Sequence, residues 1–160
     1  MAEPPHSNVT SVVEAGATIG LDVRPFRFPD GTKSAIHAAA AIGCDVGQIV
    51  NSLIFAVDGE HVLASVCGAM RVVETKLAIA AGGSTFSRVD ADTVRAATGF
   101  PIGGVPPVGH DRELRVFVDP DLLGYDSVWA ASGSWHDVFS LTPAQLVSAS
   151  GGTLDDLARS

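Results

Sequence analysis

Residues 98–109 read TGFPIGGVPPVG, and this stretch decides how the rest of the chain is interpreted. Four glycines and three prolines occur within these twelve residues, between an expected helix and an expected strand. Proline fixes the backbone φ angle and glycine frees it, so such a loop can hold exposed backbone N–H groups close to a ligand. The adjacent Gly103 and Gly104 are therefore candidates for a binding site built from backbone groups. The alternative is a tight turn that only requires positive φ.

The segments on either side of this loop alternate irregularly between short helices and short strands. Asp90 caps an expected helix that Gly99 ends, and residues 114–119 have the pattern of a strand. The other expected helices cover 33–42 (capped by Thr32 and ended by Gly43), 73–81 and 143–148, with a helical turn at 120–123; the other expected strands cover 48–57, 61–67, 127–131 and 138–141. This order indicates an α+β fold rather than a regular βαβ repeat.

Three segments together resemble the YbaK / prolyl-tRNA synthetase-associated editing domain family, whose members remove wrongly attached amino acids from tRNA. They are QIVNSLIFAV at 48–57, the glycine-proline loop, and VWAASGSWHDVF at 128–139. The resemblance runs from about residue 23 to residue 158, and its most specific part is 98–118, where the glycine pair, the proline and the following strand have the family's spacing. It implies an α+β fold with a curled mixed, largely antiparallel β-sheet surrounded by short helices.

The resemblance also assigns roles to residues. It implies that the N–H groups of Gly103 and Gly104 hold the carbonyl of the amino acid. At Asn51 most of the family has a lysine that is implicated in substrate binding and deacylation, and an asparagine offers hydrogen-bond donors but no charge. Asn51 is therefore either a substrate contact or a structural amide, and its presence leaves the activity open.

Residues 132–136 lie where the family borders its amino-acid pocket. The resemblance implies that Ser132 and Gly133 shape the pocket wall. His136 could accept a proton or orient water, or it could be an exposed loop histidine. Trp135 could stack on the terminal adenine of tRNA.

Two further residues are expected to be structural. Trp129 is flanked by apolar residues in a strand and is expected in the core, although it too could offer an aromatic surface. Asp119 is expected to cap the turn that follows it.

Composition and charge narrow the class of protein. A chain of 160 residues with 46% hydrophobic content can bury one core, so we expect one domain over 11–160 after a disordered lead over 1–10. No apolar run approaches the ~20 residues that span a bilayer, and the start has no signal-peptide pattern, so we expect a cytoplasmic protein without membrane association. Cys44 and Cys67 lack the spacing of a redox or zinc motif, and no metal or cofactor is expected.

The net charge of −8 argues against tight, sequence-independent binding of nucleic acid. A tRNA substrate is compatible with this charge if the protein binds only the acylated 3′ end, or if a synthetase or another partner supplies the contacts with the rest of the tRNA.

The resemblance therefore implies a freestanding trans-editing hydrolase that removes a wrongly attached amino acid from the 3′ end of tRNA. The alternative is a catalytically weakened or inactive module that binds aminoacyl-tRNA or a synthetase. A third possibility is hydrolysis of another small acyl ester.

Overall fold

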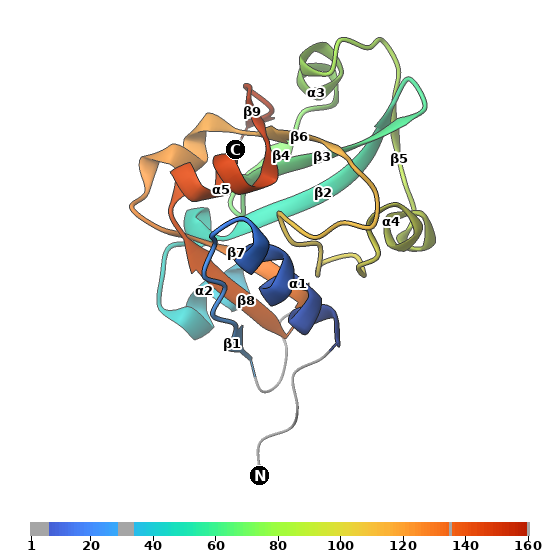
Figure 1. Ribbon diagram of the computed structural model, residues 1–160. Helices are drawn as coiled ribbons and strands as arrows, with labels where there is room; N and C mark the ends of the chain where they lie inside the picture. The colour runs from blue at the N-terminus through green and yellow to red at the C-terminus, as the bar shows by residue number, and fades with distance from the viewer. Residues whose placement is uncertain (1–6, 29–33, 135, 160) are drawn as a thin grey trace.

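The computed structural model describes residues 7–28, 34–134 and 136–159, in which short helices surround three small β-sheets (Figure 1). The helices are α1 (Ser7–Thr18), α2 (Ala35–Ile42), α3 (Glu74–Ala80), α4 (Ala91–Thr98) and α5 (Pro143–Ser150), with 3-10 helices η1 (Val46–Gln48) and η2 (Pro120–Gly124). The strands are β1 (Phe26–Arg27), β2 (Val50–Val57), β3 (Glu60–Cys67), β4 (Arg71–Val72), β5 (Phe86–Arg88), β6 (Arg115–Val118), β7 (Val128–Ser134), β8 (Asp137–Leu141), β9 (Thr153–Leu154) and β10 (Ala158–Arg159). None of the described helices is long and apolar enough to cross a membrane.

The β2–β3 hairpin is the centre of the largest sheet, whose strand order is β5-β2-β3-β6-β9. Its turn residues Asp58 and Gly59 have φ angles of 50° and 81°, which is the backbone that a tight two-residue hairpin requires. β6 and β9 join this sheet in parallel, whereas the β2–β3 and β2–β5 pairs are antiparallel. The β1-β8-β7 and β10-β4 sheets are antiparallel throughout. The prediction of an α+β fold with a mixed, largely antiparallel sheet is confirmed.

Alternation along β2 and β3 divides the interior into separate clusters. One face of the hairpin enters the first cluster, which includes Val50, Ile54 and Leu63 and also takes Phe100, Val105 and Val108 from the glycine-proline loop. The opposite face enters the second cluster, which contains Val62, Ala64, Val66, Val57 and Leu77 of α3. A third cluster lies under α2 and contains Phe28, Ala38, Ala39, Ile49 and Val138. The loop is therefore attached to the core on the first face of the hairpin.

Helix ends follow the expected caps at both ends of α4 and at the end of α2, where Gly43 has φ 86°, and differ at the start of α2. Asp90 accepts a hydrogen bond from the Thr93 N–H and Gly99 ends α4 with φ 83°, as predicted. Thr32, the expected cap of α2, lies outside the described residues, and Ser34 is the N-cap that accepts from the His37 N–H.

The N-terminal helix is a correction to the prediction. α1 begins at Ser7, inside the lead over 1–10 that was expected to be disordered, and residues 1–6 of that lead lie outside the described residues. Val9 and Val12 are buried, so packing of this helix against the body of the protein explains its order.

Candidate functional site

The glycine-proline loop is closed at its base by Thr98. The Asp111 N–H donates to the Thr98 carbonyl over 3.0 Å. The Thr98 hydroxyl is fully buried, donates to the Val94 carbonyl over 2.8 Å and accepts from the Phe100 N–H over 3.0 Å. These bonds fix both ends of the loop to the last turn of α4.

The two adjacent glycines have different positions in the loop. Gly103 is exposed and has φ 80°, whereas Gly104 is buried and donates its N–H to the Pro101 carbonyl over 2.9 Å. This bond spans four residues and its third residue has positive φ, as in a type II turn, which requires glycine at position 103. In this conformation the Gly104 N–H is already engaged, so a ligand carbonyl can receive it only by replacing Pro101.

Gly104 packs directly on the end of β7. A Cβ atom at Gly104 would lie 2.9 Å from Ser134 Cα, 3.0 Å from Ser134 N and 3.1 Å from Gly133 C. Gly133, with φ 101°, packs equally closely on Asn8 of α1, where an added Cβ would lie 2.9 Å from the Asn8 carbonyl carbon. Three backbone segments therefore lie in contact here, and only glycine permits these approaches.

His136 has partners in the turn between β7 and β8. Its N–H donates to Ser134 Oγ over 3.0 Å, and Ser134 Oγ donates to the buried carboxylate of Asp137 over 2.5 Å. The His136 Nδ1 lies 3.4 Å from the Phe28 carbonyl, and the Phe28 N–H donates to the His136 carbonyl over 2.6 Å. The half-buried imidazole is thus held beside the Gly104 contact through Ser134. Trp135 lies outside the described residues.

Sequence reasoning did not select Ser134 and Asp137 as site residues. The polar spacing SxxD across the bend was the available signal, since a serine three residues before an aspartate can bond to it across a tight turn. Their contact orders the segment that carries His136.

Asn51 lies on the opposite side of the hairpin from the loop. It is half-buried and pairs in register with Val66, so its side chain shares the face of the second cluster. Its side chain makes no hydrogen bond to any other described residue. The bridge between Ile49 and Trp129 connects the start of β2 to β7, the strand that also carries Ser132 and Gly133. β7 therefore links Asn51 to the loop contact, although no hydrogen bond joins Asn51 to Gly103 or Gly104.

Ser132 is fully buried, and its hydroxyl has no partner among the described residues. Val128, Ala130 and Ser132 occupy every second position of β7, and the first two belong to the first cluster. Ser52 and Ser65 are cross-strand partners on that same face, and their hydroxyls are also buried and unpaired in the described part of the chain. Ser132 thus points toward the interior beside the loop.

The aromatic residue of β7 is only partly in the core. Trp129 is half-buried and packs edge-on against Phe26, with ring centroids 6.3 Å apart. Phe26 is 44% exposed.

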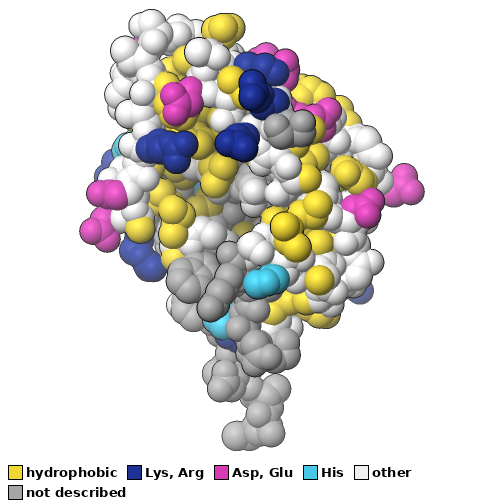
Figure 2. All heavy atoms as spheres, turned by 180° about the vertical axis from the view of Figure 1, so that it is seen from behind, with side chains coloured by type: hydrophobic (Ala, Val, Ile, Leu, Met, Phe, Trp, Pro, Cys, Tyr) yellow, Lys and Arg dark blue, Asp and Glu magenta, His cyan; other side chains and the backbone are white. Residues whose placement is uncertain are grey.

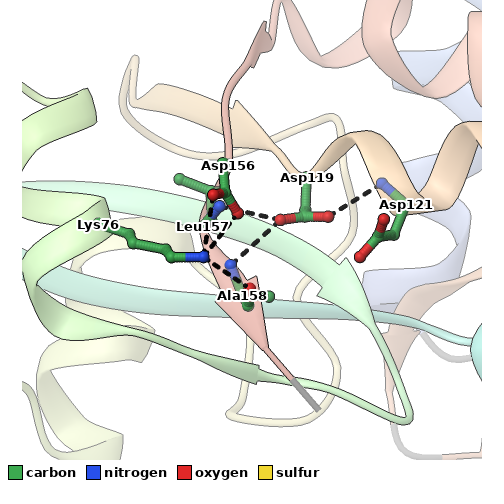
Figure 3. A network of polar contacts seen from close by, with 6 residues as sticks. All are labelled: Lys76, Asp119, Asp121, Asp156, Leu157 and Ala158. Atoms are coloured by element: carbon green, nitrogen blue, oxygen red, sulfur yellow. Dashed lines mark hydrogen bonds and ion pairs between the residues drawn. The ribbon is translucent and has the colours of Figure 1, made fainter.

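Asp119 caps the following turn, as the sequence predicts, and it also binds the C-terminal segment. The residue is 2% exposed, and its carboxylate caps η2 by accepting the Asp121 N–H over 2.9 Å (Figure 3). It also accepts the N–H groups of Leu157 over 2.9 Å and Ala158 over 3.1 Å. Asp119 therefore fastens the C-terminal strand to the sheet.

The two cysteines offer little nucleophilic chemistry. Burial is the main cause that raises the pKa of Cys67 to about 11, so its thiol stays protonated at neutral pH. Burial also raises the pKa of Cys44. No group of three potential metal ligands occurs among the described residues. The structure therefore brings together backbone groups of the glycines and the imidazole of His136, whereas the amide of Asn51 lies on the other face of the hairpin.

These features define a small α+β domain whose candidate site relies on backbone positioning. The aminoacyl-tRNA editing domain family matches residues 30–149 of this chain, so the chain belongs to that family. The resemblance inferred from the sequence is thereby confirmed.

Similar proteins agree with this membership. A crystal structure described as "a putative trans-editing enzyme for prolyl tRNA synthetase" superimposes with a TM-score of 0.92 and 37% identity, covering 98% of this chain and 100% of the other. A protein of Bacillus subtilis (strain 168), the uncharacterized YwhH, is 29% identical over 74% of this chain and 76% of its own length. The proline--tRNA ligase of Nitratidesulfovibrio vulgaris (strain DP4) is 33% identical over 67% of this chain, which spans only 18% of that ligase.

Proposed function

We propose that this protein is a freestanding trans-editing hydrolase that cleaves the ester between a wrong amino acid and the 3′-terminal ribose of tRNA. Family membership and the likeness to a trans-editing enzyme over nearly the whole chain support this function. The structural observation that carries it is the contact of Gly104 with the Gly133–Ser134 backbone, which joins the loop to β7 without intervening side chains. This contact would hold the adjacent, exposed Gly103 beside β7, where its backbone could meet the carbonyl of an ester.

The reaction would depend mainly on positioning. The exposed Gly103 is the residue we assign to the ester carbonyl, because a donor placed where negative charge develops typically contributes ~10²- to 10³-fold to the rate. Water would attack the carbonyl carbon, the bond to the ribose oxygen would break, and that oxygen would take up a proton. Holding water, ester and ribose hydroxyl together lowers the entropic part of the barrier.

The names of the relatives direct the choice of substrate. Because they include proline--tRNA ligases and a trans-editing enzyme for prolyl-tRNA synthetase, we propose tRNA specific for proline carrying a small wrong amino acid as substrate. The synthetase would be the partner that supplies the mischarged tRNA, and the reaction would take place in the cytoplasm.

The second candidate function is a binding module without catalysis. It is favoured by Asn51, whose half-buried amide has no described partner and no positive charge. Under this alternative, Asn51 contacts the aminoacyl end but does not stabilise a developing negative charge.

A deacylation assay tests the proposal. The purified protein is incubated with proline tRNA charged with alanine, cysteine, serine or proline, and Gly104→Ala is compared with Gly124→Ala. An added Cβ at Gly104 meets backbone within 3.1 Å, whereas one at Gly124 meets nothing within 4 Å. We expect the Gly104 variant to lose at least tenfold in kcat/KM while remaining folded, and the Gly124 variant to match the wild-type protein.

Asn51→Lys separates the two functions. A gain in hydrolysis would show that the natural site is weak for lack of a charge, and a loss would show that asparagine serves its own substrate. Absence of hydrolysis in both proteins would favour the binding module. Turnover of small acyl esters that does not depend on tRNA would contradict the tRNA substrate.

A further inference from the structure

Two arginines lie side by side at the C-terminal edge of the described structure. Arg71 of β4 and Arg159 of β10 are direct register partners in an antiparallel pair. The neighbouring pair, Val72 and Ala158, faces the second cluster, so the two arginines project to the opposite, exposed side. Direct cross-strand partners lie ~4.5–5.5 Å apart at Cα, so the guanidinium groups can reach the same ligand.

These two arginines have no ion-pair partner in the described part of the chain, and the acidic residues Glu74 and Asp156 lie three residues away from them in sequence. The nearby Lys76 is instead paired with Asp156 over 2.9 Å. Like charges placed directly opposite one another destabilise a β pair. In a chain whose net charge is −8, two adjacent arginines that form no ion pair with a described residue therefore offer a site that an anion would stabilise.

The arginine pair is connected to the side of the sheet that carries Asn51. Val72 packs in the second cluster together with Val66, and Asn51 is the register partner of Val66. Figure 2 shows this protein from behind, with Lys and Arg side chains gathered in the upper part of that face. Asp and Glu side chains lie among these basic groups in the same view, so the positive charge is confined to individual basic side chains rather than spread over the face.

We propose that Arg71 and Arg159 bind the phosphate backbone of the tRNA whose 3′ end enters the candidate site. This inference rests on the proposed function for the identity of the RNA. Guanidinium groups bind phosphate oxygens through paired hydrogen bonds, and two of them side by side can hold one phosphate or two consecutive ones. A small basic contact of this kind allows an acidic protein to bind RNA at one place without attracting nucleic acid over its whole surface.

Binding of uncharged proline tRNA, followed by fluorescence anisotropy between 25 and roughly 200 mM salt, tests this contact without depending on catalysis. The proteins are wild type, Arg71→Gln, Arg159→Gln, the double variant, and Arg24→Gln as control. Arg24 is an exposed arginine that pairs with Asp22 over 2.8 Å, so its replacement removes the same charge away from the patch. We expect the double variant to bind roughly tenfold more weakly at low salt and to lose about 1–2 units of the slope of log K against log salt.

A second comparison separates this contact from the reaction itself. Hydrolysis of mischarged tRNA should fall in the arginine variants through KM, while hydrolysis of a 3′-aminoacylated adenosine fragment should be unchanged. Thermal unfolding should show the double variant to be as stable as wild type or more stable, because a repulsion is removed.

The outcomes distinguish the two proposals. If tRNA is hydrolysed but the arginine variants bind and react like wild type, the phosphate contact is wrong and the hydrolase remains. If no ester is hydrolysed but salt-dependent tRNA binding is lost in the arginine variants, the contact stands and the hydrolase is wrong. An equal loss of tRNA affinity in Arg24→Gln would show that the effect depends only on net charge, and it would overturn the assignment of the site to Arg71 and Arg159.

Discussion

Ser132 and Ser65 are both fully buried, and neither hydroxyl has a hydrogen-bond partner among the described residues. Removing an unpaired buried hydroxyl relieves a desolvation cost, so we expect Ser65→Ala and Ser132→Ala to keep or raise the unfolding midpoint. Only Ser132 lies beside the Gly133–Gly104 contact. We therefore expect Ser132→Ala alone to reduce deacylation severalfold, as measured by kcat/KM on the mischarged tRNA.

Ser65→Ala is the matched control for that measurement. Equal effects of the two substitutions on kcat/KM would show that Ser132 contributes only to packing. A marked drop in the unfolding midpoint of either variant would show that its hydroxyl does have a partner.

At the level of single residues, the sequence indicated the importance of the glycine pair but not the separate positions of its members. A GG dipeptide predicts freedom of φ, and Gly103 does adopt φ 80°. Nothing local to Gly104 reveals that its missing side chain makes room for Ser134, thirty residues further along the chain, or that its N–H bonds within the loop. Such contacts depend on tertiary packing.

The buried carboxylate of Asp119 accepts three N–H groups, one from Leu157 just before the C-terminal strand β10 and one from Ala158 within it. Replacing Asp119 by alanine leaves those donors without their acceptor, so we expect Asp119→Ala to lower the free energy of unfolding by on the order of 3 kcal/mol. Asp121, whose side chain is exposed, offers a control. Asp121→Ala should change the free energy of unfolding by less than about 0.5 kcal/mol. Urea denaturation measures both.

A comparable small loss in both variants would show that the carboxylate of Asp119 is not the main attachment of β10. The exposed ion pair of Lys76 and Asp156 near the same strand is expected to contribute little, since such pairs are typically worth ~0–1 kcal/mol.

Elements with their own caps were predictable, and elements made by distant pairing were not. Asp90 and Gly99 fixed α4 at both ends because capping is local chemistry. β4 and β10 contain two residues each and exist because Val72 and Arg71 meet residues near the other end of the chain. α1 was missed for a similar reason: its polar, β-branched sequence is a weak helix former, and the burial of Val9 and Val12 stabilises it.

At the scale of the whole molecule, titratable groups give stability two different pH windows. Hydrogen bonds from Thr85, followed by Ser84, lower the pKa of Asp58, and the cap contact with Thr93 lowers the pKa of Asp90. A carboxyl whose folded pKa is lowered stabilises the protein above its unfolded pKa, here 3.8, and that contribution is lost as the pH falls through the folded pKa. The contribution of these two groups to stability is therefore present at neutral pH and changes only below about pH 3.8.

His110 acts closer to neutrality and is coupled to the glycine-proline loop. Burial is the main cause that lowers its pKa from 6.5, opposed by the hydrogen bond to the Pro106 carbonyl, which Nε2 donates over 2.7 Å. The unfolded chain therefore binds a proton near pH 6.5 that the folded protein binds only at lower pH, so folding stability decreases as the pH falls below 6.5. One proton limits this slope to about 1.4 kcal/mol per pH unit.

We expect the free energy of unfolding to decline between about pH 6.5 and the lower folded pKa of His110, and His110→Gln to flatten that decline. His37→Gln, which alters an exposed histidine of α2, should leave the profile unchanged. Burial against the loop disfavours the protonated form of His110, so its protonation favours a looser loop. If the loop loosens before the whole protein unfolds, the rate of deacylation should fall over the same pH range. A profile identical in wild type and His110→Gln would place the pH sensitivity elsewhere and remove His110 as the group that couples protonation to the loop.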